Sequence, residues 1–256
     1  MNFVLNCIIL LIVNYKADLH IHTVLSPCGD LSMSPSEIIK KAVEKNIDII
    51  GITDHNSSLN AEVTHNIGKK NGVYVMLGVE VNTREEVHSI CFMPDMTSLN
   101  DFQDFLDSKQ TFFPNSPDKF GDQFIVDENE NIIGEIEHLL INSLDLSINE
   151  LADRVAQMNG IFIPAHVDRP RYSISSQLGI VPDNLNFNVM ELSPFAQNND
   201  FLEKFPWFKN YNYITNSDAH FITDIGKSYN CLQLEHLCFD EIKTALKFAI
   251  LNFPKL

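Results

Sequence analysis

The chain has 256 residues, a length that suits one α/β barrel or two small domains. Apolar residues make up 45% of it and charged residues 20%, which excludes a disordered or a fibrous protein. Asp and Glu number 34 against 18 Lys and Arg, so the formal net charge is −16, and no Lys/Arg-rich run offsets it. Such an acidic surface repels long nucleic acid and anionic membrane, and we expect neither as a partner. A polyanionic substrate would therefore need a local positive charge, such as bound cations.

The N-terminal stretch Phe3–Val13 is nearly all apolar. It is shorter than the roughly 20 residues that a membrane span needs. No Lys or Arg precedes it and no small-residue cleavage site follows it, as a signal peptide would require. We therefore interpret residues 1–14 as an apolar extension of the main domain, 15–256, with a signal or anchor segment as the alternative.

Short runs rich in β-forming residues alternate with helix-like segments along the chain. The segment Ser34-Pro35-Ser36-Glu37 has a capping Ser, a Pro at the first helical position and a capping-box Glu. Ser147-Ile148-Asn149-Glu150 repeats the capping box, and Gly160 ends the helix that follows. Alternating strands and helices with short links predict a parallel sheet, here closed into a barrel. The expected strands are Tyr15–His22, Ile47–Thr53, Val73–Asn82, Val87–Phe92, Ile161–His166, Phe187–Leu192, Tyr213–Ser217 and Tyr229–Leu234.

One region, between Pro94 and Asn142, breaks this alternation. It is rich in Phe and contains a hairpin-like pair of runs, Gln123–Val126 and Ile132–Ile136. We interpret residues 95–142 as a small insertion between the fourth and fifth strands, packed beside the barrel mouth. We expect its phenylalanines to form a small core of their own, with a wall of the substrate pocket as the alternative.

The five cysteines are odd in number, and none forms a CxxC pair. A disulfide framework is therefore not expected. A reducing compartment, the cytoplasm, fits this cysteine usage better.

Six of the nine histidines fall at the ends of the predicted strands, with carboxylates beside them. In a barrel, the carboxyl ends of all strands open onto the face where active sites lie. In His20-Ile21-His22 the two rings are two residues apart on a strand, so both point to one side and can bind one metal ion. Imidazole together with carboxylate suits Zn²⁺, Mn²⁺ or Fe²⁺. The residues so placed are Asp18, His20, His22, Asp54, His55, Glu80, His88, His166, Asp218 and His220.

Five short segments that contain these residues together resemble the motifs of the PHP family (polymerase and histidinol phosphatase). The segments occur in the same order as in that family. The resemblance spans Lys16 to Lys247 and is nearest to the TrpH-like branch. It implies an α/β fold, a distorted (β/α)7 barrel, with a trinuclear centre of three divalent metal ions, zinc, manganese or iron. The segments are Asp18-Leu19-His20-Ile21-His22-Thr23, Ile52-Thr53-Asp54-His55-Asn56, Gly78-Val79-Glu80, Pro164-Ala165-His166 and Ser217-Asp218-Ala219-His220.

The resemblance also implies how the ligands divide among the ions. In many relatives one ligand is an Asp five positions after the second His of the first segment, where this chain has Pro27. The loop looks lengthened by three residues, so we assign Asp30 to this role; a Cys28 thiolate is the alternative, although a plain buried cysteine is favoured. The first ion would take His20, His22, Glu80 and Asp218, the second would share Glu80 and add His88 and His166, and the third would take His55, His220 and Asp30.

Closely spaced divalent ions lower the pKa of a bridging water and give hydroxide at neutral pH. They also supply the local positive charge that an acidic protein needs to attract a phosphate. Arg169 and Arg171 follow His166 closely, and a guanidinium matches a phosphate edge, so we expect both to bind substrate. Relatives of the exonuclease and nucleotide-phosphatase type have an Arg in the position of Arg169. The alternative is an ordinary salt bridge to Asp168 or a neighbour.

Other residues near the segments have supporting roles or none. We interpret Asp18 and Asp54 as carboxylates that orient the imidazoles, with Asp54 as a catalytic proton shuttle in the alternative. Glu191 is expected either to hydrogen-bond a ligand or to lie solvated at the barrel edge. The residues expected to lie outside the site are His65, His138, His236 and the aromatic cluster Phe201–Phe208.

The sequence therefore predicts a metal-dependent phosphoesterase that hydrolyses a small phosphorylated substrate by metal-activated hydroxide. The substrate classes expected are a nucleotide, a nucleoside bisphosphate or a short 5′-phosphorylated oligonucleotide. A histidinol-phosphate phosphatase is the second enzyme hypothesis. A non-catalytic, metal-bound PHP module is the alternative from another class. A metal-dependent amidohydrolase is disfavoured, because no Lys on a predicted strand offers a bridge between metals.

Overall fold

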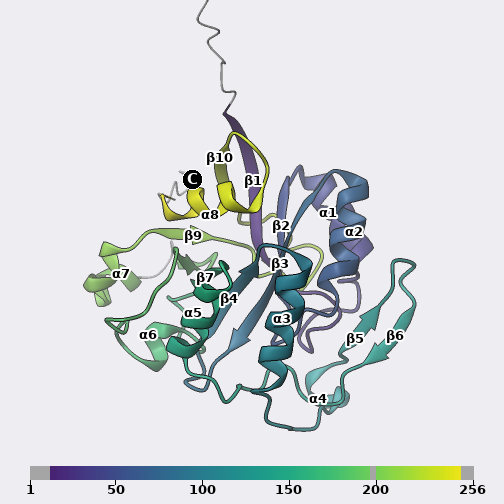
Figure 1. Cartoon of the computed structure of the whole chain (residues 1–256), viewed down its shortest axis with the longest axis horizontal. Coiled ribbons are helices and arrows are strands. Elements are labelled where there is room, and N and C mark those ends of the chain that lie inside the picture. The colour runs from purple at the N-terminus through teal and green to yellow at the C-terminus, as the bar shows by residue number, and fades with distance from the viewer. Residues whose placement is uncertain (1–11, 197–199, 249–256) are drawn as a thin grey trace, which may run out of the picture.

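The computed structural model describes residues 12–196 and 200–248. The largest sheet has six strands in the order β10-β1-β2-β3-β4-β7, the pair β8-β9 lies next to β7, and β5-β6 is a separate hairpin (Figure 1). All eight expected strands are present. The bounds are β1 Val13–Ile21, β2 Ile49–Ile52, β3 Tyr74–Asn82, β4 His88–Met93, β5 Phe124–Val126, β6 Ile132–Glu135, β7 Ile161–Pro164, β8 Met190–Leu192, β9 Tyr213–Thr215 and β10 Asn230–Leu234.

The sheet curls back on itself. The backbone N–H of Val167, just after β7, donates to the Glu191 carbonyl oxygen on β8. At the other side of the curl, Ile21 at the end of β1 forms a parallel bridge with Ala219, which follows β9. The expected α/β class and its curled, barrel-like sheet are therefore confirmed. The extension predicted for residues 1–14 falls almost wholly outside the described residues.

The strand directions correct one expectation, because the sheet is mixed and not parallel throughout. β4 is antiparallel to both β3 and β7, and β10 is antiparallel to β1. The physical reason is the link between β3 and β4, which is too short for the helical crossover that parallel strands need. This reversal pairs His88 with Asn82 and so places the start of β4 at the edge where β3 ends.

The helices begin largely where the sequence predicts. Ser34 caps α1 by accepting from the Glu37 backbone N–H, but the Glu37 carboxylate accepts from Lys40 instead of completing the capping box. Ser147 and Glu150 form the full reciprocal box at α5. The bounds are α1 Pro35–Lys45, α2 Ala61–Asn71, α3 Met96–Asp107, α4 Pro117–Phe120, α5 Ile148–Gln157, α6 Ile174–Gln177, α7 Phe201–Lys204, the 3₁₀ helix η2 Pro206–Asn210 and α8 Phe239–Lys247.

The inner face of the curl changes from apolar to ionisable along each strand. Residues two apart on a strand share a face, so Met76 and Glu80 of β3 both point inward, as do Phe92 and His88 of β4. Met76 and Phe92 belong to a buried cluster that α8 covers with Phe239 and its neighbours. The opposite face of the sheet packs on α1, α2, α3 and α5. The fold thus closes one end of the curl with apolar side chains and leaves ionisable ones at the other end.

Two glycines make room for the Phe92 ring in this inner core. A Cβ on Gly51 would lie 2.7 Å from Phe92 Cζ and 2.6 Å from the Leu19 carbonyl oxygen, and a Cβ on Gly78 would lie 2.5 Å from Phe92 Cδ1. We expect Gly78→Ala to lower the free energy of unfolding by about 1–3 kcal/mol, because overpacking forces the ring or the backbone to move. Urea unfolding midpoints would measure the loss.

The Gly78→Ala prediction can be tested with a matched control variant and with a second substitution that restores space for the ring. Gly134→Ala places its Cβ 3.2 Å from the flexible end of Ile125 on the exposed hairpin, so we expect a change below about 0.5 kcal/mol. Adding Phe92→Leu to Gly78→Ala should recover part of the loss. A Gly78→Ala protein as stable as the wild type would mean that the core around Phe92 adapts freely.

The segment expected as an insertion contains α3, α4 and the β5-β6 hairpin, and the hairpin is confirmed. The expected separate core of phenylalanines is wrong. Phe102 is fully buried in the main core, whereas Phe112 and Phe113 are exposed. The reason is that α3 packs directly on the sheet and takes Phe102 with it. The four cysteines in the described ranges are free, as expected. Among the described residues, no helix has the length and apolar character to cross a membrane.

Candidate metal centre

The Glu80 carboxylate lies in the middle of a group of imidazoles at the ionisable end of the curl. Its Oε1 atom is 3.0 Å from His88 Nδ1 and 3.1 Å from His166 Nε2. Its Oε2 atom is 3.0 Å from His55 Nδ1. The Nε2 atom of His20 lies 3.4 Å from Glu80 Oε1, and the Nε2 atom of His22 lies 3.5 Å from Glu80 Oε2. One buried carboxylate therefore contacts five histidines that come from four different strand ends.

Asp218 supplies a second carboxylate on the same side of the group. Its Oδ1 atom is 3.3 Å from Nε2 of both His20 and His22, and 3.6 Å from His220 Nδ1. The backbone φ angles of His166 and Asp218 are 29° and 50°, in the left-handed region that non-glycine residues seldom occupy. Such backbone conformations persist where the surrounding structure enforces them, and here both residues turn a side chain toward the group.

The ligand atoms are close enough together to hold divalent ions. Atoms lying within 4.8 Å of one another form three sets among the described residues. Buried ring nitrogens of His88 (Nε2) and His166 (Nδ1) also have no hydrogen-bond partner in this part of the chain. The nitrogen and oxygen donors, their burial and their spacing fit a divalent metal centre. The three sets are His22, His55 and His220; His20, His22 and Asp218; and His55, Glu80 and His88.

Two of the buried rings have the protonation state that metal binding needs, whereas the carboxylates of Glu191 and Asp218 outweigh burial and raise the pKa of His20. Burial lowers the pKa of His22 well below its usual value and that of His88 to about 4, so both rings are neutral at pH 7 and keep a lone pair. Burial would raise the pKa of Glu80, but His88, His20 and His55 hold it well below the usual range. Glu80 is therefore an anion in the middle of the group, which is the state that a bridging ligand needs.

Glu191 fixes two of these histidines from behind. Its carboxylate lies 3.0 Å from His20 Nδ1 and accepts from the His166 backbone N–H at 3.0 Å. It also accepts from the Asn216 amide at 2.8 Å and is buried. The hypothesis that Glu191 hydrogen-bonds a ligand is therefore supported, and the solvated alternative is not. Asn216 had no signal in the sequence, because only the fold brings it to Glu191.

Asp54 acts on His22 through Ser26 and not directly. Its carboxylate accepts from the Thr23 backbone N–H and hydroxyl and from the Ser26 hydroxyl, each at 2.7 Å. The Ser26 oxygen is in turn 2.9 Å from His22 Nδ1. Asp54 is buried and uses both oxygens in these bonds, which supports an orienting role and not the proton-shuttle alternative. Sequence reasoning missed Ser26 and Thr23.

Asp18 forms no hydrogen bond with an imidazole among the described residues, so the expectation that it orients a ring does not match the geometry; it holds the loop that bears Asp218. It accepts from the backbone N–H groups of Ser217 and Gly226 at 3.0 and 2.9 Å. Burial raises the pKa of Asp18 to about 6 against the effect of these bonds. The three other histidines, His65, His138 and His236, take no part in the metal-binding sets, as expected.

The structure does not bring Asp30 into the group, although eight of the nine predicted ligands meet there. The Asp30 carboxylate is exposed and accepts from the Ser32 backbone N–H at 2.9 Å and hydroxyl at 2.6 Å. Its own backbone N–H donates to the His220 carbonyl oxygen, so the chain passes close by while the side chain turns outward. The assignment of Asp30 therefore does not match the geometry.

Cys28 lies where a ligand from this loop was expected. The residue is exposed, but its sulfur lies beside the rings of His55 and His220 and interacts with both. Burial of the sulfur opposes its ionisation, yet the two neighbouring imidazoles lower the pKa of the thiol to about 6. The expectation of a plain buried cysteine is wrong.

The loop after His166 carries the predicted substrate-binding arginines. Arg169 is 36% exposed, and its Nη2 atom is 2.6 Å from Asp218 Oδ2, the carboxylate oxygen that faces away from His20. Arg171 is exposed. The Tyr172 ring stacks on His88 with a centroid distance of 4.8 Å and is partly exposed. Sequence reasoning missed Tyr172, although its place on the same loop was a usable signal.

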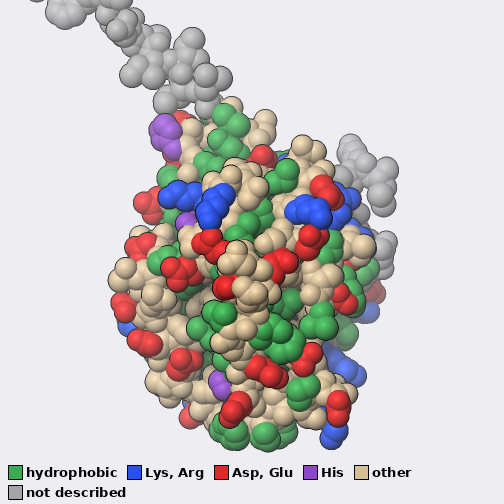
Figure 2. Space-filling view, turned by 90° about the vertical axis from the view of Figure 1, so that its right-hand side faces the viewer, with side chains coloured by type: hydrophobic (Ala, Val, Ile, Leu, Met, Phe, Trp, Pro, Cys, Tyr) green, Lys and Arg blue, Asp and Glu red, His purple; other side chains and the backbone are tan. Residues whose placement is uncertain are grey.

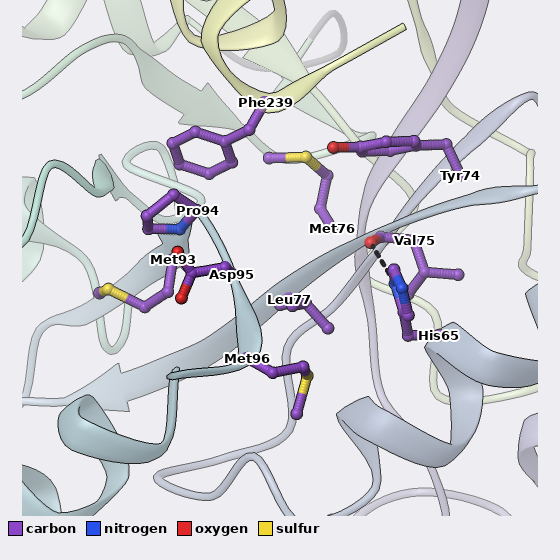
Figure 3. Close-up of a pocket in the computed structure, with 10 residues that line it drawn as sticks. All are labelled: His65, Tyr74, Val75, Met76, Leu77, Met93, Pro94, Asp95, Met96 and Phe239. Atoms are coloured by element: carbon purple, nitrogen blue, oxygen red, sulfur yellow. Dashed lines mark hydrogen bonds between the residues drawn. The ribbon is translucent and has the colours of Figure 1, made fainter. Parts of the chain in front are cut away.

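Pockets in the described part of the chain also lie outside the group of imidazoles. One of about 290 Å³ borders the amino-terminal half of β3, far along the strand from Glu80, and contains His65, whose Nδ1 is 3.4 Å from the Val75 carbonyl oxygen (Figure 3). Another, of about 330 Å³, lies between the predicted insertion, including Phe112, and the loop after His55, including Leu59. The second pocket adjoins a predicted ligand strand and is the better candidate for holding part of a substrate.

Comparison with known proteins places the chain in a family. A model of the PHP domain matches residues 18–167, which is more than half of the chain. The chain belongs to the PHP domain family. It is 25% identical to the protein YqxK of Bacillus subtilis (strain 168) over 262 residues, covering 90% of this chain and 61% of YqxK.

Solved structures of several other proteins share the fold. The lesion-specific endonuclease PfuEndoQ from Pyrococcus furiosus gives a TM-score of 0.69 at 21% identity, covering 92% of this chain and 56% of that chain. An endonuclease Q complex with a 27-mer duplex bearing an abasic lesion gives the same score at 20% identity. A protein from Bifidobacterium adolescentis assigned as a metal-dependent phosphoesterase gives 0.58 at 15% identity and is covered over 98% of its length. This chain thus spans little more than half the length of YqxK and of the endonuclease.

Proposed function

We propose that this PHP domain is a metal-dependent phosphoesterase that hydrolyses a phosphate ester of a nucleotide or a short nucleic acid. The observation that carries the proposal is the Glu80 carboxylate, held as an anion within 3.5 Å of five imidazoles beside a second carboxylate, Asp218. Buried carboxylate and imidazole groups gathered in this way fit divalent ions better than any packing role. The proposed ligands are His20, His22, His55, Glu80, His88, His166, Asp218 and His220, and we propose a centre of up to three ions.

Different residues of this chain would have different roles in such a site. When bound, closely spaced divalent ions acidify a coordinated water and neutralise the charge on a phosphate. Glu191 and Ser26 hold the rings of His20 and His22 in orientation through their second nitrogens. Arg169, at the open edge of the group, is placed to bind a phosphate oxygen.

The charge distribution favours a small substrate. The net charge is −16, and on the face seen in Figure 2 Lys and Arg occur in separate groups among Asp and Glu and form no continuous basic track. Extended nucleic acid binding usually needs such a track. The pocket of about 330 Å³ beside the loop after His55 is at the lower end of the size range of small-molecule sites. An assignment to the TrpH-like branch rests on the predicted insertion before the His166 strand and on Arg169, three residues after His166.

A second candidate is cleavage of damaged duplex DNA. The similarity to endonuclease Q over 92% of this chain favours it, because one of those structures holds a 27-mer duplex with an abasic lesion. This chain spans only 56% of that endonuclease, so duplex binding by the rest of the relative does not carry over. Histidinol phosphate and a metal-bound module without activity remain the other hypotheses to compare.

The test is product release by protein loaded with Mn²⁺ or Zn²⁺ across a panel of substrates. The panel contains a nucleoside 3′,5′-bisphosphate, a 5′-phosphorylated trinucleotide, histidinol phosphate and a duplex 27-mer with an abasic site. We expect turnover of the first two compounds. Cleavage of the duplex alone would favour the nuclease hypothesis, and selective turnover of histidinol phosphate would favour that phosphatase. Metal binding without turnover would favour the non-catalytic module.

His166→Ala is the matched loss-of-function variant for this panel. It removes a ring that lies 3.1 Å from Glu80, and we expect below about one tenth of the wild-type rate with an unchanged circular dichroism spectrum. His236→Ala, at an exposed histidine outside the centre and outside both pockets described above, is the control and should retain full activity. A His166→Ala variant that keeps more than about one tenth of the wild-type rate would contradict the assignment of His166 as a metal ligand.

A further inference from the structure

The loop between β1 and α1 holds Cys28 in a defined position against two of the predicted ligands. The Gly29 backbone N–H donates to the Ser26 carbonyl oxygen at 2.9 Å, and the Asp30 N–H donates to the His220 carbonyl oxygen at 2.9 Å. A Cβ on Gly29 would come within 2.6 Å of the Thr23 carbonyl oxygen, so only glycine permits this tight turn. The turn therefore fixes which side chain of the loop points toward the centre.

The predicted insertion supports the same loop from outside. Gly121, which follows α4, packs so closely on the Pro27 backbone that a Cβ there would overlap the Pro27 carbonyl oxygen. Gly121 also has a φ angle of +100°, a conformation that favours glycine. Two separate contacts, from the His220 segment and from the insertion, thus hold the residues on either side of Cys28.

The sulfur completes a set of donors that the histidines leave open. His55 and His220 belong with His22 to one metal-binding set, and the Cys28 sulfur lies beside the rings of both His55 and His220. The buried His55 Nδ1 lies 3.0 Å from Glu80 Oε2, so this ring lies between the Glu80 carboxylate and the Cys28 sulfur. No carboxylate of this loop can take the third place, because Asp30 is bound to Ser32 and points outward.

We propose that Cys28 is a thiolate ligand of the ion held by His55 and His220, in the place where an Asp would be expected. This inference rests on the proposed metal centre. A sulfur ligand favours zinc and iron over manganese at this one position, because soft thiolates select such metals. Cys28 and His220 are also the most exposed members of the centre, so the sulfur-ligated ion lies at its solvent-facing edge.

Cobalt-substituted protein tests the inference independently of activity. We expect the wild type to show a near-ultraviolet thiolate-to-cobalt charge-transfer band. Cys28→Ser should lose that band and bind one fewer ion per chain or bind it at least about tenfold more weakly. Cys28→Asp should keep the metal content without the band, and its preference for Zn²⁺ over Mn²⁺ should fall by about tenfold or more.

Two controls accompany these variants. Cys231→Ser removes an exposed cysteine on β10 and should leave the band and the metal content unchanged. Asp30→Asn tests the competing ligand directly and should also change neither. Alkylation in the absence and presence of Zn²⁺ gives a second readout, in which metal should protect Cys28 but not Cys231 of the same molecule.

The outcomes separate this inference from the proposed function. Cobalt binding without a charge-transfer band, a band that survives in Cys28→Ser, or loss of an ion in Asp30→Asn would each overturn the thiolate ligand while leaving a metal centre in place. A wild-type protein that binds no cobalt would overturn the proposed function, and this inference with it.

Discussion

Replacing Glu80 by Gln is expected to lower phosphoesterase turnover by well over ~100-fold, which is more than the loss of a residue that merely orients a ligand costs. The amide keeps the shape of the side chain but removes the negative charge that five imidazoles surround. It also places an NH₂ donor among ring nitrogens that must stay unprotonated to bind metal. Initial rates at saturating metal, with metal content by elemental analysis, would measure both effects.

A matched exchange on the surface controls for the chemistry of the substitution. Glu62 lies exposed in the first turn of α2, away from the centre, so Glu62→Gln should keep full rate and full metal content. Circular dichroism of both variants would show whether the fold survives. A folded Glu80→Gln protein that retains its metal and more than a tenth of the rate would exclude Glu80 as the bridging ligand.

Most of the centre could be predicted because its ligands lie at strand ends, where local sequence sets both position and direction. His20 and His22 are two apart on β1, and this spacing alone puts both rings on one side of the strand. The resemblance then supplied the grouping, and the structure gathers eight of the nine residues, six histidines around Glu80 and Asp218. The strand positions were equally readable, since each is a short apolar run between turn signals.

The ninth position shows where local sequence stops being informative. Counting along the loop after His22 favoured Asp30, because counting follows the chain and not the direction of side chains. That direction depends on a bond to the His220 carbonyl oxygen and on packing against Gly121, both far away in sequence. The same limit applies to the Ser26–Asp54 bond, which joins residues 28 positions apart.

The direction of β4 was misjudged for a different reason. Alternating runs predicted a parallel sheet, yet the turn at Thr83–Glu86 is too short for anything except a hairpin. The link length is readable from the sequence and favours a hairpin over the helical crossover that the general alternation predicts. The site prediction survived the error, because an antiparallel β4 presents its first residue, His88, at the edge where β3 ends.

Replacing Arg169 by Ala is expected to raise KM for a phosphate ester about 10-fold or more, with a smaller change in kcat and no loss of metal. A charge-assisted hydrogen bond to a phosphate contributes about 1.5–3 kcal/mol, which corresponds to roughly that change in affinity. Arg169 is placed for this role because it is partly exposed and contacts the outer oxygen of Asp218, while the inner oxygen faces His20 and His22. Steady-state kinetics would measure the changes in KM and kcat. Elemental analysis of the same samples would show whether metal is retained.

The ion pair with Asp218 gives Arg169 a competing role, that of holding a ligand in position. Arg169→Lys separates the two, because a lysine can keep the charge near Asp218 but cannot present a planar fork to a phosphate. A substrate-binding role predicts that Lys leaves metal content intact and restores little of the KM. A positioning role predicts the reverse, with metal lost in Arg169→Ala, regained in Arg169→Lys, and KM unchanged once metal is saturating. Arg171→Ala, on the same loop but exposed, shows how much of any effect is only nearby positive charge.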